Sequence, residues 1–527
     1  MRIRESHRGS GGSTRGMGWY GTREDCTREG AVVRDPQRRS REGQRWRAQS
    51  ADGLVVPVKR RNCRGGKGPW SRSSERSGKN QEIGVSLQTP EVSVRKLQTA
   101  LHAKAKAEPC CRFYSLWDKV FRDDVLREAW RRCRANGGAA GADGVGFADI
   151  EAEGRERWLG NLQQELRAGQ YRPQPLLRVW IPKSSGGQRP LGIPTIRDRV
   201  VQAAAILVLG PIFEADLLEE QYGFRPGRDA KMALRQVVHH LQRQRRTEIV
   251  DADLSDYFNT IPHGALMKCV ARRIADGRIL SIIKRWLTTP VVERIGRATS
   301  QSNEARRTRR GTPQGGVVSP LLANLYFRRF LLGWQRARPS VREAAAIVNY
   351  ADDFVICCKP GVGLAAMATM RALMARLGLQ VNDRKTRLAR LPEERFDFLG
   401  YTVGRFYSKD GKPYLGTAPS KKAIQRVMRR IHDETSRRWL GKTIESRIVE
   451  VNRVLRGWCG YFNQGPVRDA YEKLAWYTQR RLQRWLARKH KKPGSGSRQY
   501  PHELLYGKLG LYRPTVPARS LPRAKAR

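Results

Sequence analysis

Two short β-like segments carry aspartates inside otherwise apolar sequence, and they constrain the fold of this 527-residue chain more than any other feature. In residues 248–254, a strand turns its alternating apolar side chains into a core and places Asp253 on the opposite face. In residues 347–356, apolar runs flank Asp352 and Asp353, which indicates a β-hairpin with both carboxylates at its turn. Carboxylates within apolar strands are costly unless they are paired or bind metal. These segments predict a metal site, although an Asp-Asp pair alone is more often a solvated turn.

The charge balance indicates the kind of partner. The chain has 102 Lys and Arg against 49 Asp and Glu, a formal net charge of +53. Such an excess favours a polyanionic partner, nucleic acid first and an anionic membrane second. The longest apolar run, residues 200–213, is too short to span a bilayer, and the N-terminus lacks the apolar region of a secretory signal. The cysteines lack the C-x-x-C spacing of a zinc ribbon and fit a reducing compartment. We therefore expect an intracellular, nucleic-acid-binding protein that does not bind membranes.

The chain divides into regions of different character. Residues 1–85 are basic and rich in Gly and Ser without periodicity, so we predict a disordered extension. It is a solvated tail, a flexible RNA-binding arm, or the product of a start codon assigned too early. In residues 86–405, β-like runs alternate with longer helical ones, which predicts an α+β domain. Residues 406–515 carry three amphipathic helical stripes and predict a helical domain. A basic tail, residues 516–527, follows.

A series of short motifs occurs in a fixed order along the chain. Residues 253–258 read Asp-Leu-Ser-Asp-Tyr-Phe, and residues 350–353 read Tyr-Ala-Asp-Asp. The other motifs occupy residues 181–194, 198–202, 221–227, 311–324, 377–386 and 396–401. The series resembles the reverse transcriptases encoded by bacterial and organellar group II introns, over about residues 92–515. One such motif is weak evidence, but the ordered set is specific.

The resemblance implies a fold and an activity. The fold would be a right-hand polymerase, whose fingers and palm contain an antiparallel sheet carrying the Tyr-Ala-Asp-Asp hairpin. An α-helical thumb or maturase domain would follow, because residues 456–462 and 501–506 resemble that domain. The implied function is RNA-directed DNA polymerisation together with binding of a group II intron RNA to assist splicing and mobility. The implied partners are that intron RNA, a template RNA with a DNA primer or target DNA, and dNTPs. Many relatives end in an HNH endonuclease, whose motifs are not found after residue 498, so we expect the form without it.

The resemblance also assigns the carboxylates. Asp253, Asp352 and Asp353 would be the catalytic acids that hold two Mg²⁺ ions, for which Mn²⁺ can substitute, and Leu254 would add its backbone carbonyl. Mg²⁺ prefers such hard oxygen ligands. Two ions together can activate a primer 3′-hydroxyl and stabilise the departing pyrophosphate. Asp353 is expected to bind less directly than the other two. Asp251 has no place in the family's triad and is interpreted as a structural acid.

Five residues match positions that bind the incoming dNTP in this family. Lys183 and Arg189 would grip the triphosphate, as suits an ammonium point charge beside a guanidinium fork. Phe258 would lie under the sugar and exclude a 2′-hydroxyl, although a core aromatic is the alternative. Gln314 would contact the nucleotide from a glycine-rich loop. Lys385 would protonate the pyrophosphate, or else bind phosphate or support the structure.

The last 107 residues contain 27 Lys and Arg and 7 Asp and Glu, a net +20. Arg480, Arg484 and Arg488 recur every four residues on one helix face, beside Arg481 and Lys489. A charged helix face is usually only solvated, but at this charge density we predict RNA-phosphate binding that weakens with salt. The aromatic residues of the preceding helix are expected to pack in a core rather than stack on bases.

Two other functions fit parts of the pattern. One is a catalytically silent RNA-binding splicing cofactor built on a polymerase scaffold, and the intact aspartates argue against it. The other is a reverse transcriptase domesticated for another task, such as phage defence. We expect a cytoplasmic, bacterial protein, in association with the nucleoid, rather than an organellar one, because the N-terminus does not resemble a transit peptide. The sequence sets no oligomeric state.

Overall fold

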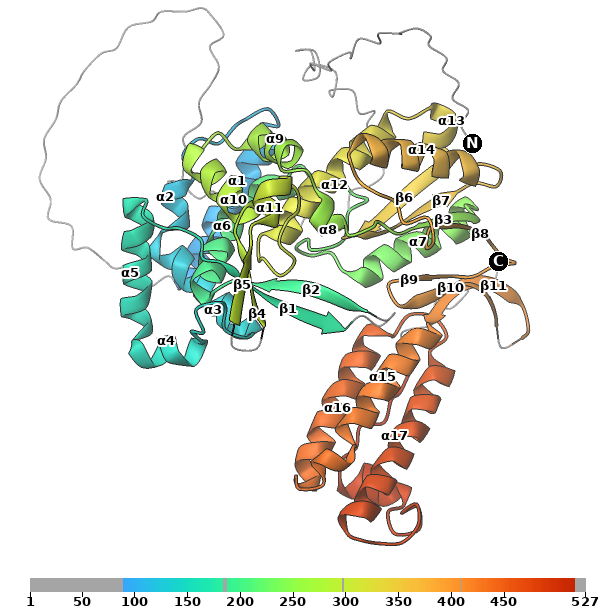
Figure 1. The fold of residues 1–527 in the computed structure, drawn as a ribbon. Helices are drawn as coiled ribbons and strands as arrows, with labels where there is room; N and C mark the ends of the chain where they lie inside the picture. The colour runs from blue at the N-terminus through green and yellow to red at the C-terminus, as the bar shows by residue number, and fades with distance from the viewer. Residues whose placement is uncertain (1–88, 183–186, 296–297, 409, 517–527) are drawn as a thin grey trace, which may run out of the picture.

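The computed structural model describes residues 89–182, 187–295, 298–408 and 410–516. The predicted N-terminal extension, Lys183 and all but one residue of the predicted basic tail lie outside these ranges. Figure 1 shows a larger part built from helices and sheets and a bundle of long helices that projects from it.

The first part of the described chain is helical. One helix, α6 (Ile196–Glu214), is apolar around most of its circumference and is buried along nearly its whole length. The helices that precede α6 in the sequence share one hydrophobic core with it. They are α1 (Pro90–Ala107), α2 (Trp117–Val120), α3 (Asp123–Asn136), α4 (Phe147–Glu153) and α5 (Arg155–Ala168).

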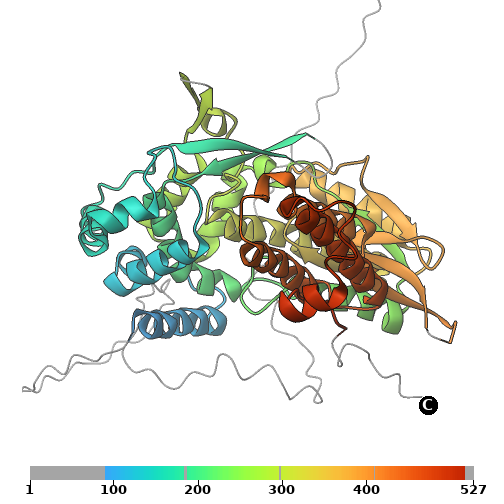
Figure 2. The same ribbon diagram turned by 90° about the horizontal axis from the view of Figure 1, so that it is seen from below.

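A four-stranded sheet stands beside these helices, in the order β2-β1-β4-β5. Its strands are β1 (Leu176–Pro182), β2 (Gln188–Ile193), β4 (Val291–Ile295) and β5 (Ala298–Ser302). The pairs β1–β2 and β4–β5 are antiparallel hairpins, joined by a parallel β1–β4 contact. Figures 1 and 2 both show the β1–β2 hairpin extending from the helical part toward the C-terminal part of the molecule. Three helices directly precede β4 in the sequence, α8 (Tyr257–Thr260), α9 (His263–Arg273) and α10 (Gly277–Leu287), and α11 (Glu304–Thr308) follows β5.

A second four-stranded sheet, which we call the palm sheet, is antiparallel throughout, with the order β6-β7-β3-β8. Its strands are β3 (Glu248–Ala252), β6 (Ala345–Tyr350), β7 (Asp353–Cys358) and β8 (Arg387–Arg390). One face packs on α12 (Ser319–Gln335) and α14 (Gly363–Arg376), and the other face packs on α7 (Ala230–Gln244). The short α13 (Pro339–Arg342) leads into β6. Both segments predicted as β-structure form strands, and the structure pairs them in one antiparallel sheet.

The face of β3 that carries the aspartates is covered in part by α7. Val250 and Ala252 point into the core beneath α12 and α14, as predicted. Ile249, on the same face as the aspartates, is also fully buried, because it packs under the apolar face of α7. The face that carries Asp251 and Asp253 is thus covered by α7 at Ile249, and it becomes partly exposed at Asp251.

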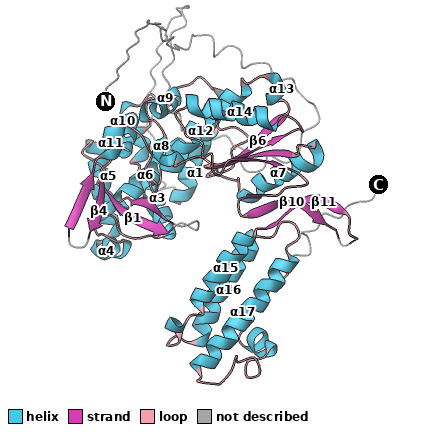
Figure 3. Ribbon diagram, turned by 45° about the vertical axis from the view of Figure 1, so that its right-hand side comes forward, coloured by secondary structure: helices cyan, strands magenta, loops and turns pink. Residues whose placement is uncertain are grey.

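The C-terminal part begins with a small sheet of order β11-β10-β9. It contains β9 (Phe396–Phe398), β10 (Tyr401–Tyr407) and β11 (Pro413–Pro419). The bundle that follows contains α15 (Lys421–Glu434), α16 (Ile444–Tyr461) and α17 (Arg468–Lys489), with the short η2 (Arg437–Trp439) and η3 (Leu504–Lys508). Figure 3 shows the three long helices side by side below the strands of this sheet. Their apolar stripes form one shared core, and the predicted helical C-terminal region is confirmed.

Aromatic residues join the bundle to the small sheet. The rings of Trp458 and Phe462 have centroids 4.6 Å apart, and Phe462 lies 5.0 Å from Tyr401. The Tyr461 hydroxyl donates to the Leu399 carbonyl at 2.9 Å. These aromatic residues pack in a core, as expected. The predicted domain boundary at residue 405 falls inside β10, and the domain limits remain predictions.

Candidate active site

The tight turn between β6 and β7 presents Asp352. Tyr350 pairs with Asp353, so the turn contains only two residues, and Ala351 has a φ of 61°. Buried Asn349 donates through Nδ2 to the Ala351 carbonyl at 2.8 Å. This side chain fixes a left-handed conformation that residues with a Cβ seldom adopt. The sequence therefore forms a rigid turn that projects a carboxylate from the end of the palm sheet.

Asp253 reaches the same end of the sheet from the neighbouring strand. The β3–β7 register pairs Asp251 with Val355 and Ala252 with Phe354, so its continuation sets Asp253 opposite Asp353. Side chains directly opposite each other in an antiparallel pair lie on one face with Cβ atoms about 5 Å apart. The register thereby brings Asp253 beside Asp353, although about a hundred positions separate them in the sequence, and Asp352 directly precedes Asp353. The metal-binding role of the three carboxylates stays a prediction.

The segment after α14 holds Asp253 in place. One carboxylate oxygen, Oδ2, accepts from Asn382 Nδ2 at 3.0 Å and lies 3.2 Å from Lys385 Nζ. The backbone nitrogen of Asp253 donates to Thr386 Oγ1 at 3.3 Å. Leu254 forms an antiparallel bridge with Val381, and the role of its carbonyl oxygen stays a prediction. The sequence did not predict the contribution of Asn382 and Thr386, whose only signal was their place beside Lys385 in one motif.

Negative charge accumulates at this end of the palm sheet. Desolvation and the charges of Asp352 and Asp253 raise the pKa of Asp353 to about 6. The Asp353 side chain is exposed at the end of the sheet, where the neighbouring carboxylates of Asp352 and Asp253 oppose its ionisation. Burial likewise raises the pKa of Asp251 to about 6, against the opposing effect of Arg387, whose Nε lies 3.6 Å from Asp251 Oδ2. Carboxyls that are difficult to ionise together favour a bound cation.

The acids are close but are not arranged as a finished coordination shell. Among the residues that the structure describes, no group of three or more His, Cys, Asp or Glu side chains is gathered tightly enough to hold a metal ion. Oδ2 of Asp253 instead faces Lys385 and Asn382. Oxygen donors of this kind suit a hard divalent cation such as Mg²⁺ or Mn²⁺.

Arg189 and Gln314, both predicted to contact the nucleotide, meet in the structure. Arg189 Nε donates to Gln314 Oε1 at 2.7 Å, and the Gly192 backbone nitrogen donates to the Gln314 carbonyl at 2.7 Å. A Cβ at Gly315, whose φ is 104°, would clash with the Gly192 carbonyl. The glycine therefore permits the loop to lie against β2. Lys183, the other predicted phosphate ligand, lies outside the described residues.

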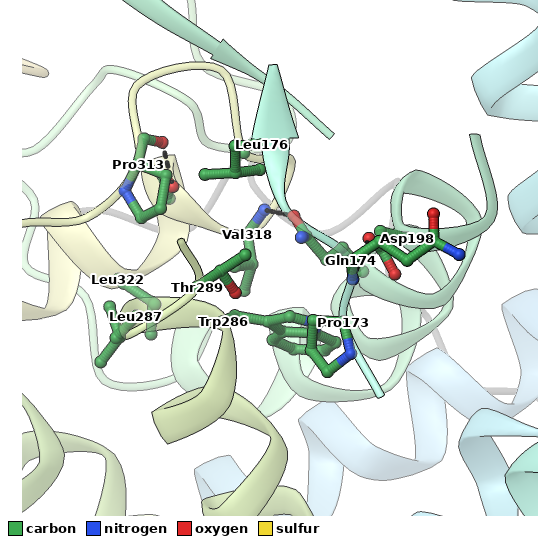
Figure 4. A pocket seen from close by; sticks show the side chains of 13 residues that line it. Pro173, Gln174, Leu176, Asp198, Trp286, Leu287, Thr289, Pro313, Val318 and Leu322 are labelled. Carbon is green, nitrogen blue, oxygen red and sulfur yellow. Dashed lines mark hydrogen bonds between the residues drawn. The ribbon is translucent and has the colours of Figure 1, made fainter. Parts of the chain in front are cut away.

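A small, mostly apolar cavity lies behind this loop (Figure 4). Ser319 Oγ donates to the Pro313 carbonyl at 2.7 Å, and the Val318 backbone nitrogen donates to Gln202 Oε1 at 3.3 Å. At the other side of the cavity, buried Asp198 accepts from the Tyr171 hydroxyl at 2.6 Å. The Val318–Gln202 bond connects the segment that follows the glycine-rich loop, residues 311–316, to α6.

Phe258 is attached to the same loop from α8. Its carbonyl accepts from the Thr312 backbone nitrogen at 2.7 Å. Only 7% of Phe258 is exposed, and its ring centroid lies 5.7 Å from that of Tyr257. Phe258 thus belongs to the core beneath the site. It can act as the predicted sugar gate only if the nucleotide reaches the small exposed part of its side chain.

The predicted RNA-binding residues of α17 fall into two groups. Arg480, Arg484 and Arg488 are exposed along one face of the helix. Arg481 instead donates through Nη2 to the carbonyls of His432 in α15 and of Thr435, the residue that caps this helix, at 3.3 and 3.0 Å. Lys489 Nζ donates to the Leu440 and Lys442 carbonyls, both at 2.9 Å. The last two cations hold the bundle together, and their contact with RNA stays a prediction.

The described residues form no helix that has the length and apolar character required to cross a membrane. This finding concerns only the ranges that the structure describes.

Two family models match the chain, one in each part of the fold. The family model described as reverse transcriptase (RNA-dependent DNA polymerase) matches residues 181–403. The model described as group II intron, maturase-specific domain matches residues 424–501. The first match contains the three aspartates and the glycine-rich loop of residues 311–316, and the second covers most of the bundle.

Individual relatives align over much of the chain. Protein YkfC of Escherichia coli is 35% identical over 369 residues, which cover 63% of this chain and 93% of YkfC. The group II intron-encoded protein LtrA of Lactococcus lactis is 25% identical over 495 residues, covering 76% of this chain and 80% of LtrA. Among solved structures, telomerase from Candida albicans aligns with 65% of this chain and 67% of its own at 12% identity. The TM-score of 0.35 is too low for that likeness to support an inference.

Proposed function

The chain belongs to the reverse transcriptases that carry a group II intron maturase domain, and we propose that Asp253, Asp352 and Asp353 are its catalytic carboxylates. The chain is an RNA-directed DNA polymerase that also acts in intron splicing and mobility. The observation that carries the proposal is the β3–β7 register, which continues to Asp253 opposite Asp353.

The polymerase depends on a divalent metal, as its domain implies, and we propose Mg²⁺, with Mn²⁺ as a substitute. The donors are hard carboxylate oxygens, to which Leu254 would add its carbonyl. The raised pKa of Asp353, caused by desolvation and by Asp352 and Asp253, indicates negative charge that a cation would neutralise. Two bound ions would supply activation of the primer hydroxyl and stabilisation of the leaving pyrophosphate.

The chain's own residues would position the reactants. Asp253 is fixed by Asn382, so its carboxylate is oriented before substrate arrives. Arg189 and Gln314 are joined by a hydrogen bond and would orient the triphosphate of a dNTP together with Lys183. Such positioning and electrostatic stabilisation account for most of the catalysis expected in phosphoryl transfer.

Two further contacts complete the proposed dNTP site. Phe258 would exclude a 2′-hydroxyl at the exposed edge of its ring. Lys385 lies 3.2 Å from the Asp253 carboxylate, near where the pyrophosphate would leave, and would donate a proton or bind phosphate there.

The bundle would provide the RNA surface. Binding of a group II intron RNA is implied by the maturase domain and by the relationship to LtrA. We propose that Arg480, Arg484 and Arg488 contact its phosphates, because all three are exposed on one face. A template RNA paired with a DNA primer or target DNA is the proposed polymerase substrate. The bacterial relatives support a location in a bacterial cytoplasm, and association with the nucleoid is proposed from the positive charge of the chain alone.

A primer-extension assay tests the proposal. The wild-type protein and the Asp352→Ala variant are each given an RNA template, a DNA primer, dNTPs and Mg²⁺. Binding of the intron RNA by both proteins is measured in parallel. We expect wild-type extension, no product with Asp352→Ala, and equal RNA binding by both proteins. Wild-type protein that supports splicing but makes no metal-dependent DNA would instead identify a silent splicing cofactor.

A further inference from the structure

Phe224 combines two unfavourable features beside the turn that carries Asp352. Its φ is 56°, in the left-handed region that residues with a Cβ seldom adopt. Its side chain is also 57% exposed, so it contributes little to a core. The preceding residue is Gly223, which would be expected to take the left-handed conformation in its place. A strained, exposed aromatic side chain beside a catalytic turn suggests contact with a substrate.

The residues on either side of Phe224 are held firmly. The Gly223 carbonyl accepts from Asn324 Nδ2 at 2.8 Å. Buried Arg225 forms an ion pair with Glu214 at 2.7 Å and donates to the Gln221 carbonyl at 2.8 Å. The conformation of Phe224 is therefore imposed by its anchored neighbours and is not that of a loosely held loop.

The same segment is fixed against the catalytic turn. The Tyr222 backbone nitrogen donates to the Asn349 carbonyl at 2.9 Å. A Cβ at Gly223 would clash with the backbone nitrogen of Ala351. This close approach requires glycine at position 223, so the glycine is retained for space although Phe224 carries the left-handed conformation. Phe224 consequently lies one residue from a backbone contact with the turn that presents Asp352.

The segment also lies close to the bundle. Lys231, in the first turn of α7, donates to the Gly460 carbonyl of α16 at 2.6 Å. Tyr461 also belongs to α16. Its pKa is raised mainly by burial, and the negative charge of Asp229 contributes to the rise. The 224–231 stretch thus runs from the catalytic turn toward the base of the bundle.

We propose that the Phe224 ring stacks on the nucleotide at the 3′ end of the primer. This inference rests on the proposed function, since the primer 3′-hydroxyl must reach the carboxylates of Asp253 and Asp352 and its nucleotide must then lie beside this turn. An exposed ring offers a face to any base, which suits a polymerase that extends all sequences. The nearby guanidinium of Arg228, 5.2 Å from the Tyr222 ring centroid, adds positive charge for the adjoining phosphate.

The test compares Phe224→Ala, Phe224→Gly and Phe224→Tyr. With wild-type protein extending a primer on RNA, we expect Phe224→Ala and Phe224→Gly to raise the KM for primer–template about tenfold, as loss of one stacking contact implies, and to leave the KM for dNTP nearly unchanged. Phe224→Tyr keeps the aromatic face and should retain the wild-type value. A fluorescent adenine analogue at the primer 3′ end, bound to proteins that also carry Asp352→Ala, reports stacking without catalysis. Its quenching should be lost with Phe224→Ala.

Phe224→Gly separates stacking from a structural role. Glycine accepts a φ of 56° without strain, so this variant should melt at the wild-type temperature or higher while losing primer affinity. Arg245→Gly is the matched control, because Arg245 has a φ of 50° and is exposed at the end of α7, away from the turn. It should leave the primer KM unchanged.

The outcomes distinguish this inference from the proposed function. If Phe224→Ala keeps the primer KM and the quenching of the wild-type protein, and the wild-type protein is active, the stacking contact is overturned. The polymerase assignment then still stands. A lower melting temperature in Phe224→Gly that accounts for its activity loss would also overturn it, in favour of a structural role. Absence of extension by the wild-type protein would contradict the proposed function itself.

Discussion

Nζ of Lys385 lies 3.2 Å from Oδ2 of Asp253. A cation supplied by the protein therefore neutralises one of the proposed catalytic carboxylates, where a divalent metal is proposed to bind. The same oxygen accepts from Asn382 Nδ2 at 3.0 Å. We expect metal binding to release Lys385, which then becomes available to the leaving pyrophosphate.

Lys385→Ala is predicted to strengthen metal binding and weaken catalysis. Removal of the competing ammonium should raise the affinity of the nucleotide-free protein for Mn²⁺ several-fold, because opposite charges at this distance interact by about 1 kcal/mol or more near a protein surface. The polymerisation rate should fall at saturating metal. Mn²⁺ titration by electron paramagnetic resonance and single-turnover extension measure the two effects. Reduced Mn²⁺ affinity would show that Lys385 supports the metal site instead of competing for it.

Asp353→Asn is predicted to stabilise the metal-free protein at neutral pH. The pKa of Asp353 is raised to about 6, by desolvation and neighbouring carboxylates, from about 3.9 in an unfolded chain. The folded state therefore binds more protons than the unfolded state between about pH 4 and pH 6. The ionised carboxyl destabilises the fold above pH 6, and this effect is relieved as the pH falls toward 4.

Thermal unfolding from pH 4.5 to pH 8 measures this effect. In the absence of metal, Asp353→Asn should melt above the wild type at pH 7.5, and the difference should shrink as the pH falls through about 6. Saturating Mg²⁺ should narrow or reverse the difference, because the wild type gains more from the cation. A variant that melts below the wild type at every pH without metal would contradict the predicted repulsion.

Phe258→Val is predicted to increase ribonucleotide incorporation. A smaller side chain leaves space for the 2′-hydroxyl, and we expect roughly a tenfold or greater rise in ribonucleotide use relative to dNTP use, equivalent to about 1.4 kcal/mol. Phe327→Leu is the matched control, because Phe327 is fully buried in the same core. Relative kcat/KM values for the two sugars measure the change. Equal loss of stability in both variants with unchanged sugar selectivity would assign Phe258 to the core alone.

Replacement of Arg480, Arg484 and Arg488 by alanine is predicted to weaken intron RNA binding. Loss of three phosphate contacts should reduce the slope of log affinity against log salt by about 2 to 3. Arg481→Ala is the control, since its guanidinium ties α17 to α15. It should lower the melting temperature and leave the salt slope unchanged. An equal change of slope in the control would instead support the predicted RNA contact of Arg481.

The strands of the palm sheet could be predicted because alternation and the flanking apolar runs are local properties of the sequence. The side on which Val250 points into the core follows from the same alternation. Burial of Ile249 could not be predicted, because it depends on α7 packing across the second face of the sheet. That contact is a tertiary one with no signature in β3 itself.

The carboxylates were predicted as a set, but their immediate partners were not. Asn382 lies 129 residues from Asp253 in sequence, and only the packing of the segment after α14 brings them together. Arg481 looked equivalent to Arg480 in the sequence, yet one step along a helix turns its side chain by about 100° toward the carbonyls of α15. The conformation of Phe224 was hidden because a Gly-Phe pair would normally place the left-handed residue at glycine.

Anomalous diffraction from Mn²⁺ bound with a primer–template and an unreactive dNTP analogue tests the central claim most directly. The account predicts manganese between the carboxylates of Asp253 and Asp352, with Lys385 moved away from Asp253. Manganese bound elsewhere in a protein that extends primers, with no peak between these two carboxylates, would contradict it.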